Sequence, residues 1–247
     1  MRVRVSCFLL RARLTYATAE VARNLTDKTN MPLTVGHYLN NMAVLTDQWN
    51  QSSYKDPTRQ RIYLKDVDCP LLWHEKLTNL IPPSLFYLDN TTDANPKFKG
   101  PGSRHPRRRA CRSPGDLMAC LPADVRAKNL QCYIGYEGTY TPAHHEMCGT
   151  MGHNIMVEAS NGQMEHGKRT KPGSSIWLMT ETKDRDVVSE YWMSTLGHDM
   201  AIEDHFAQIN AWKLAPFKTY IVEQKPGDFL LIPPLAVHQV GGTLNCV

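Results

Sequence analysis

The chain has 247 residues, of which 42% are hydrophobic and 21% are charged, and this is the composition of an ordinary globular protein. The composition excludes a collagen-like, coiled-coil or disordered chain. No apolar run approaches the roughly 20 residues that a membrane helix needs, so we expect no membrane partner. The seven cysteines form no C-x-x-C pair, which favours reduced thiols in an intracellular protein over a disulfide framework.

The net charge of +4 comes from one short stretch of the chain. Residues 97–112 contain seven basic side chains and no acidic one. Glycines and prolines in the same stretch disfavour regular structure, so we expect a basic, disordered insertion at about 95–115. Two interpretations remain open for it. It is either a solvated loop without a partner, or a patch that makes a weak nucleic-acid contact or directs nuclear import.

The first 60 residues carry helix signals. Residues 14–24 are rich in alanine and arginine, and residues 34–47 repeat apolar side chains at helical spacing. We therefore predict an N-terminal helical segment over residues 1–60, followed by a larger domain over residues 61–247. A further short helix is predicted over residues 116–129.

From residue 131 onward the sequence predicts strands. Short β-prone runs are separated by glycine, proline or polar clusters, a spacing typical of an all-β sandwich or barrel. One helix, predicted over residues 184–196, interrupts the strands. We therefore expect a mainly β fold. The predicted strands cover residues 131–136, 153–159, 175–180, 207–212, 218–223, 228–232 and 237–240.

The chemistry of the chain concentrates in two distant motifs. His144 and Glu146 belong to the first, and His238 follows a predicted strand in the second. Because side chains alternate faces along a strand, His144 and Glu146 would point to one side and His145 to the other. A third ligand from a distant strand would complete two histidines and one carboxylate on a divalent metal, with open positions suited to non-haem Fe(II) oxygen chemistry. His238 is the candidate for that ligand.

The two motifs resemble the signature of the JmjC (Jumonji C) oxygenases, T-x-x-H-x-D/E followed by G-D-x-x-x-I-P-x-x-x-x-H. Residues 141–146 and 227–238 match this signature closely, and residues 177–239 resemble a fungal branch of the family. The resemblance covers roughly residues 70–240. It implies a double-stranded β-helix, the jelly-roll or cupin architecture, for which the helical segment would form an N-terminal cover.

The resemblance also implies a cofactor and its contacts. The family binds Fe(II) through residues that correspond to His144, Glu146 and His238. The co-substrate 2-oxoglutarate chelates the iron in these enzymes. The positions that contact the co-substrate correspond to Thr141, Asn154 and Ser175. Many members carry a lysine where this chain has Ser175, so the salt bridge to the far carboxylate of 2-oxoglutarate is expected to be missing.

An enzyme of this kind would act on a protein substrate, a histone among the candidates, by methyl-lysine demethylation or side-chain hydroxylation. We expect it in the nucleus, with the cytoplasm as the alternative. Two other functions remain open: an inactive JmjC-fold regulator of chromatin or transcription, and a metal-binding cupin that does not use 2-oxoglutarate. Only nine residues follow His238, so we expect the closing strand and helices that the family usually adds to be missing.

Overall fold

The computed structural model describes residues 19–47, 58–68, 131–162, 164–165, 167–169 and 171–243. The chain divides into two compact units, one formed by residues 1–65 and 133–247 and the other by residues 66–132. The predicted helix over residues 116–129 and the predicted basic insertion lie outside the described residues. The predicted boundary near residue 60 stays a prediction. Within the described part of the chain, no helix is long and apolar enough to span a membrane.

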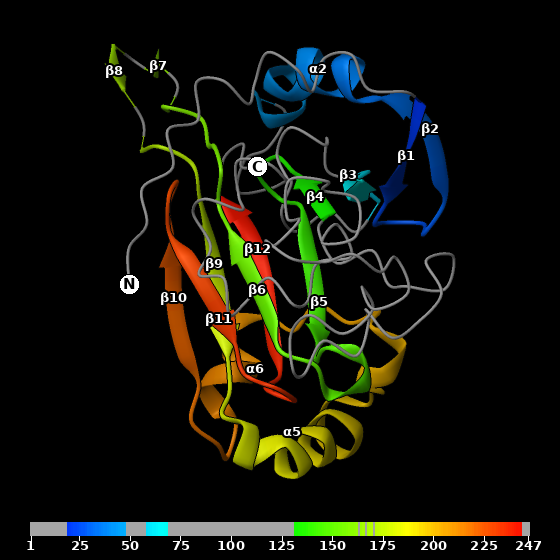
Figure 1. Cartoon of the computed structure of the whole chain (residues 1–247), viewed down its shortest axis with the longest axis vertical. Coiled ribbons are helices and arrows are strands. Elements are labelled where there is room, and N and C mark those ends of the chain that lie inside the picture. Colours follow the sequence, from blue (N-terminus) through cyan, green and yellow to red (C-terminus); the bar gives the residue numbers. More distant parts are fainter. Residues whose placement is uncertain are drawn as a thin grey trace, which may run out of the picture. The chain divides into compact units, whose positions relative to one another are not determined.

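The first described elements form one sheet and one helix (Figure 1). They are β1 (Ala19–Asn24), β2 (Asn30–Thr34), α2 (Val35–Asp47) and β3 (Ile62–Asp68). Strand β4 (Gln131–Ile134) completes a sheet in which the strand order is β2-β1-β3-β4. β1 pairs antiparallel with β2 on one side and with β3 on the other, so it is a central strand.

The helix predicted over residues 14–24 is wrong in its described half, which is strand β1. Ala22 is fully buried, and the buried side chain of Asn24 accepts two backbone N–H bonds. Pairing on both sides satisfies the backbone of β1, and this outweighs the local helix propensity of alanine and arginine. The helix predicted over residues 34–47 is confirmed as α2. The predicted helical cover is therefore a mixture of strands and one helix in its described part.

Two antiparallel sheets form the larger part of the described chain. One has the strand order β10-β9-β12-β5, and the other pairs β11 with β6. Figure 1 shows β6 and β11 lying across β9 and β12, and the fold is mainly β with few helices, consistent with the predicted jelly roll. The strands are β5 (Tyr140–His144), β6 (Gly152–Ile155), β9 (Ser174–Met179), β10 (Tyr220–Gln224), β11 (Phe229–Ile232) and β12 (His238–Thr243), with a short hairpin of β7 (Met164–Glu165) and β8 (Lys168–Arg169).

The chain between β9 and β10 is helical. The helix predicted over residues 184–196 is confirmed as α5 (Arg185–Tyr191) and the π-helical turn η10 (Trp192–Leu196). The strand predicted over residues 207–212 is wrong, because this stretch leads into the helix α6 (Ile209–Leu214). Trp212 is the one fully buried side chain of α6, so the alternating burial of a strand is absent there. The helix ends before Ala215, whose backbone is extended as expected for a residue that precedes proline.

Two apolar clusters lie on opposite faces of the four-stranded sheet. The first packs α5, η10 and α6 against the sheet through Trp192 and Trp212, whose ring centroids are 4.8 Å apart. The second lies between the two sheets, where Trp177 and Met179 of β9 pack with Ile232 of β11. The face of the four-stranded sheet that meets β11 is therefore the inner face, and the other face carries the helices.

Candidate metal centre

A β-bulge in β5 sets the direction in which His144 points. In the ladder between β5 and β12, His144 pairs with His238 and Thr141 pairs with Val240. β5 therefore advances three residues where β12 advances two, so β5 contains one extra residue. Pro142 lies in this bulge, on an edge strand of its sheet, and both are places where proline is tolerated. The bulge puts Thr141 and His144 on the same face, whereas a regular strand would place them on opposite faces.

The ladder registers bring most of the candidate residues to the inner face. Residues directly opposite each other in paired strands point to the same side of the sheet. β12 pairs with β9 so that Val240 lies opposite Trp177 and Gly242 lies opposite Ser175. Ser175 and Trp177 therefore share the face of Thr141, His144 and His238. Trp177 packs against β11, which identifies this face as the one between the sheets.

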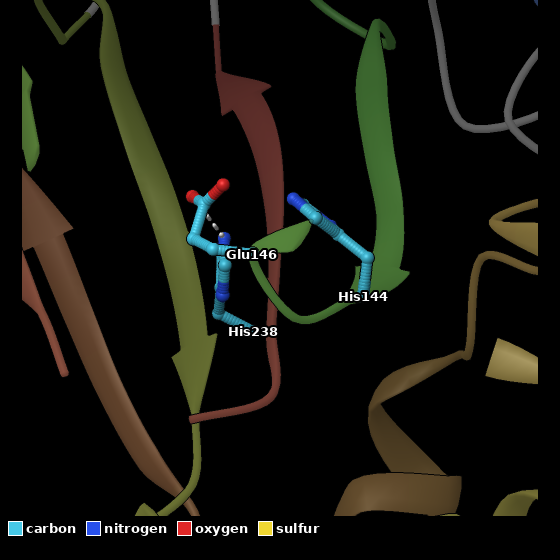
Figure 2. A group of neighbouring side chains, drawn as sticks. All are labelled: His144, Glu146 and His238. Carbon is cyan, nitrogen blue, oxygen red and sulfur yellow. Dashed lines mark ion pairs between the residues drawn. The ribbon is translucent and has the colours of Figure 1, made fainter. Parts of the chain in front are cut away.

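Three side chains converge on the inner face, from His144, Glu146 and His238 (Figure 2). Each can offer one ligand atom, and these atoms all lie within 4.8 Å of one another. His238 Nε2 is 3.7 Å from Glu146 Oε1, and the two imidazole centroids are 4.2 Å apart. His144 is the last residue of β5 and His238 the first of β12, whereas Glu146 follows β5 in a segment of extended backbone.

Hydrogen bonds fix the tautomer of both imidazoles. His144 Nδ1 is 2.8 Å from the carbonyl oxygen of Pro142, and His238 Nδ1 is 3.1 Å from that of Ala236. A carbonyl oxygen can only accept, so both Nδ1 atoms must carry the proton and donate it. Each Nε2 then keeps its lone pair free, as a metal ligand requires, and the backbone contact holds the ring orientation. Two imidazoles and one carboxylate are a donor set that suits Fe(II).

His238 lies in an environment that keeps it neutral. Its side chain is 2% exposed, and burial, reinforced by the nearby imidazole of His144, lowers its pKa to about 3. The imidazole therefore carries no proton on Nε2 at neutral pH and needs no deprotonation before it can bind a metal. The ring of Trp177 stacks on it, with 5.9 Å between centroids and 25° between planes.

A buried chain of hydrogen bonds supports Trp177. Its indole Nε1 donates to Gln224 Oε1 at 2.8 Å, and Gln224 Nε2 donates to Asn154 Oδ1 at 2.8 Å. Gln224 Nε2 also lies within donating distance of the backbone oxygens of Asn154 and Asp228. These hydrogen bonds run from β6 through β10 to the indole that stacks on His238. They therefore connect the two sheets next to the candidate ligands.

Replacing Gln224 with leucine is expected to lower the free energy of unfolding by about 1–3 kcal/mol. The change keeps the size of the side chain but leaves the buried indole N–H of Trp177 without its acceptor. Urea denaturation measures the effect. Ile221→Gln, on the exposed part of the same strand, is the matched control and should change stability by no more than about 0.5 kcal/mol. Equal losses in the two variants would mean that Gln224 does not hold the indole.

The structure places the predicted site residues in two groups. His144, Glu146 and His238 come together, and they are the one such cluster of three potential ligands in the described part of the chain. Thr141 and Ser175 share their face through the strand registers, and Asn154 reaches the same region through Gln224. His145 stands outside the ligand cluster. The predicted alternation along a strand was wrong in one detail, since β5 ends at His144 and Glu146 follows it.

Sequence reasoning missed the residues that support the ligands. Trp177 lies in a predicted strand and Gln224 directly follows one, but nothing in their local pattern indicates that they meet. Gly152, whose Cα lies against the side chain of Glu146, was also missed. A glycine beside a predicted strand was the available signal, because it often marks a close backbone approach.

Comparison with known proteins identifies the class to which this fold and site belong. Residues 131–247 match the family model described as "JmjC domain, hydroxylase". This stretch contains both sheets and all three converging side chains, so this part of the chain is a JmjC domain.

The chain is also similar to a particular characterised protein. It is 30% identical, over 196 residues, to C-module-binding factor A of Dictyostelium discoideum. The match covers 79% of this chain but 16% of the relative, so the chain spans about a sixth of the relative's length. The similarity extends beyond the 131–247 stretch, because 196 residues exceed the length of that stretch.

Proposed function

We propose that the chain is an Fe(II)- and 2-oxoglutarate-dependent oxygenase that acts on a protein substrate. The observation that supports this most is the convergence of two imidazoles and one carboxylate on the inner face of a JmjC domain. His144, Glu146 and His238 would hold the iron. Fe(II) with 2-oxoglutarate and O₂ supplies the oxidising power for hydroxylation of a C–H bond, with succinate and CO₂ as coproducts.

The residues of the chain would prepare this chemistry in three ways. The backbone carbonyls of Pro142 and Ala236 orient the imidazoles, so that both Nε2 atoms face the carboxylate. Trp177 covers the ring of His238 and shields it from water. The bulge in β5 brings the candidate ligands to one face, and a metal held by these three side chains would have further positions for small molecules.

Three neutral side chains would position the co-substrate. Thr141 and Ser175 are buried on the inner face, and Asn154 lies on β6 opposite them. Ser175 stands where the family resemblance leads us to expect a lysine. We therefore propose that hydrogen bonds, not a salt bridge from this position, hold the far carboxylate of 2-oxoglutarate.

For the substrate we propose a methyl-lysine protein, with a histone as the first candidate and demethylation ahead of side-chain hydroxylation. We place the protein in the nucleus. Peptides incubated with the enzyme, Fe(II) and 2-oxoglutarate would separate the two reactions by mass spectrometry. Demethylation removes a methyl group and releases formaldehyde, whereas hydroxylation adds one oxygen atom. A product of either kind supports an oxygenase, and only the first supports a demethylase.

The test of the cofactor is spectroscopic. Under anaerobic conditions, Fe(II) and 2-oxoglutarate together should give the weak visible charge-transfer band of a chelated 2-oxo acid. Glutarate is the matched control, since it lacks the 2-oxo group and should give no band. A protein that binds Fe(II) but shows no band would be a metal-binding cupin that does not use 2-oxoglutarate. Absence of Fe(II) binding would contradict the proposed function.

A second candidate function is a binding protein that keeps the JmjC fold without turnover. The relative is named for a binding activity, to a C-module, and Ser175 replaces the expected lysine. Release of succinate from 2-oxoglutarate in the presence of Fe(II) and O₂ would eliminate this candidate. The same assay without protein substrate is sufficient, because uncoupled turnover still consumes the co-substrate.

A further inference from the structure

Glu146 lies directly against the backbone of β6. A β-carbon built on Gly152 in ideal geometry would lie 2.5 Å from Glu146 Oε1, 3.1 Å from its Cδ and 3.2 Å from its Cγ. Real β-carbons essentially never approach another heavy atom within 3.0 Å. The carboxylate of Glu146 therefore occupies space that a side chain at position 152 would fill.

The backbone of Gly152 does not itself need glycine. Gly152 does not have the positive φ that favours this residue, and it pairs with Ile232 as the first residue of β6. Any amino acid with a small side chain could adopt this backbone. The space above its Cα is thus the one feature of position 152 that requires glycine.

The contact determines where the carboxylate can go. Glu146 follows β5 on a loop, its side chain is 33% exposed, and its Oε1 lies 3.7 Å from His238 Nε2. Exposed glutamate side chains have many rotamers, and those that turn away from the site compete with the one that meets the imidazoles. Because Gly152 has no side chain, Glu146 can adopt the rotamer that points its carboxylate towards the imidazoles. A methyl group at position 152 would occupy the space of that carboxylate and disfavour this rotamer.

We infer that Gly152 is a positioning residue, which keeps the Glu146 carboxylate within reach of His144 and His238. Gly152 touches neither metal nor substrate and acts only through Glu146. The inference rests on the proposed metal site, and it adds a residue on β6 to the requirements of that site.

Gly152→Ala in the full chain is the test, with Co(II) as an air-stable probe of the site. The substitution should lower the affinity for Co(II) by about 10- to 100-fold, the range for loss of a group that orients a metal ligand. It should also change the visible absorption of any bound Co(II), since the carboxylate is displaced from the metal. The melting temperature of the metal-free protein should be unchanged or higher, because alanine is favoured over glycine in a strand.

Gly241→Ala is the matched control. Gly241 lies in β12, three residues after His238, and it also lacks a positive φ. A β-carbon there would meet two ring carbons of Phe206 at 3.8 and 3.9 Å, which is ordinary van der Waals contact. Co(II) affinity should therefore stay at the wild-type value.

A double-mutant cycle separates positioning from general damage. Glu146→Asp shortens the carboxylate by one methylene, so its oxygens withdraw from Gly152. In that background, Gly152→Ala should lower the Co(II) affinity by no more than about 2-fold. Undiminished Co(II) affinity of Gly152→Ala in the wild-type background would overturn the inference while leaving the proposed metal site intact. An equal loss in both backgrounds would also overturn it, and a wild-type chain that binds no Co(II) or Fe(II) would remove the metal site and the inference together.

Discussion

Replacing Glu146 with alanine is expected to abolish tight binding of Fe(II) or Co(II). The affinity should fall by more than the roughly 10- to 100-fold that follows loss of an outer-shell partner, because a direct ligand is removed. The same result is expected for His144→Ala, since the two changes remove different members of one cluster within 4.8 Å. Equilibrium dialysis of the metal against each purified variant measures the loss.

His145→Ala is the matched control for these variants. His145 lies between the two ligands in the sequence, but its Nδ1 lies 3.3 Å from the carbonyl oxygen of Glu146 and its ring stands outside the cluster. The metal affinity of this variant should stay close to that of the unmodified chain. Equal losses in all three variants would show that substitution disturbs the whole loop, and that the cluster does not define the ligands.

Trp192→Ala should be the most damaging single change to stability. Trp192 is 1% exposed at the junction of α5, α6 and the outer face of the four-stranded sheet. Truncation of a buried tryptophan typically lowers the free energy of unfolding by about 3–5 kcal/mol, because it combines lost burial with a cavity. Urea denaturation followed by fluorescence measures the change.

Met193→Ala is the control at the next position. The side chain of Met193 is more than half exposed, so its truncation should change the free energy of unfolding by no more than about 0.5 kcal/mol. If Met193→Ala were as damaging as Trp192→Ala, the contact of Trp192 with the sheet would not be what distinguishes the two positions.

The strands that carry the site could be predicted because their signals are local. β9, β10, β11 and β12 contain β-prone residues between glycine and proline, and the structure forms strands in each predicted run. The spacing of His144 and Glu146, with a distant histidine after a proline pair, was enough to select the three side chains that converge. Metal chemistry limits these residue types strongly, so their pattern is more informative than the pattern of ordinary core residues.

The parts that could not be predicted depend on contacts between distant segments. β1 forms a strand because β2 and β3 pair with it on both sides, and its own residues favour a helix. Residues 209–214 form the helix α6 where a strand was predicted, and Trp212 of this helix packs against Trp192 of a distant segment. The closeness of Gly152 to Glu146 depends on the position of β6 relative to the loop after β5, for which no local pattern exists.

The extra residue of β5 accounts for the spacing of the first motif. Without Pro142, Thr141 and His144 would lie two positions apart, and a regular strand would present both on the inner face without a bulge. An interval of three between threonine and histidine is incompatible with an undistorted strand that presents both to one ligand. The interval itself therefore encodes the distortion: straightening the strand at its present length would turn the imidazole of His144 towards Leu178 and the helices, away from its two partners.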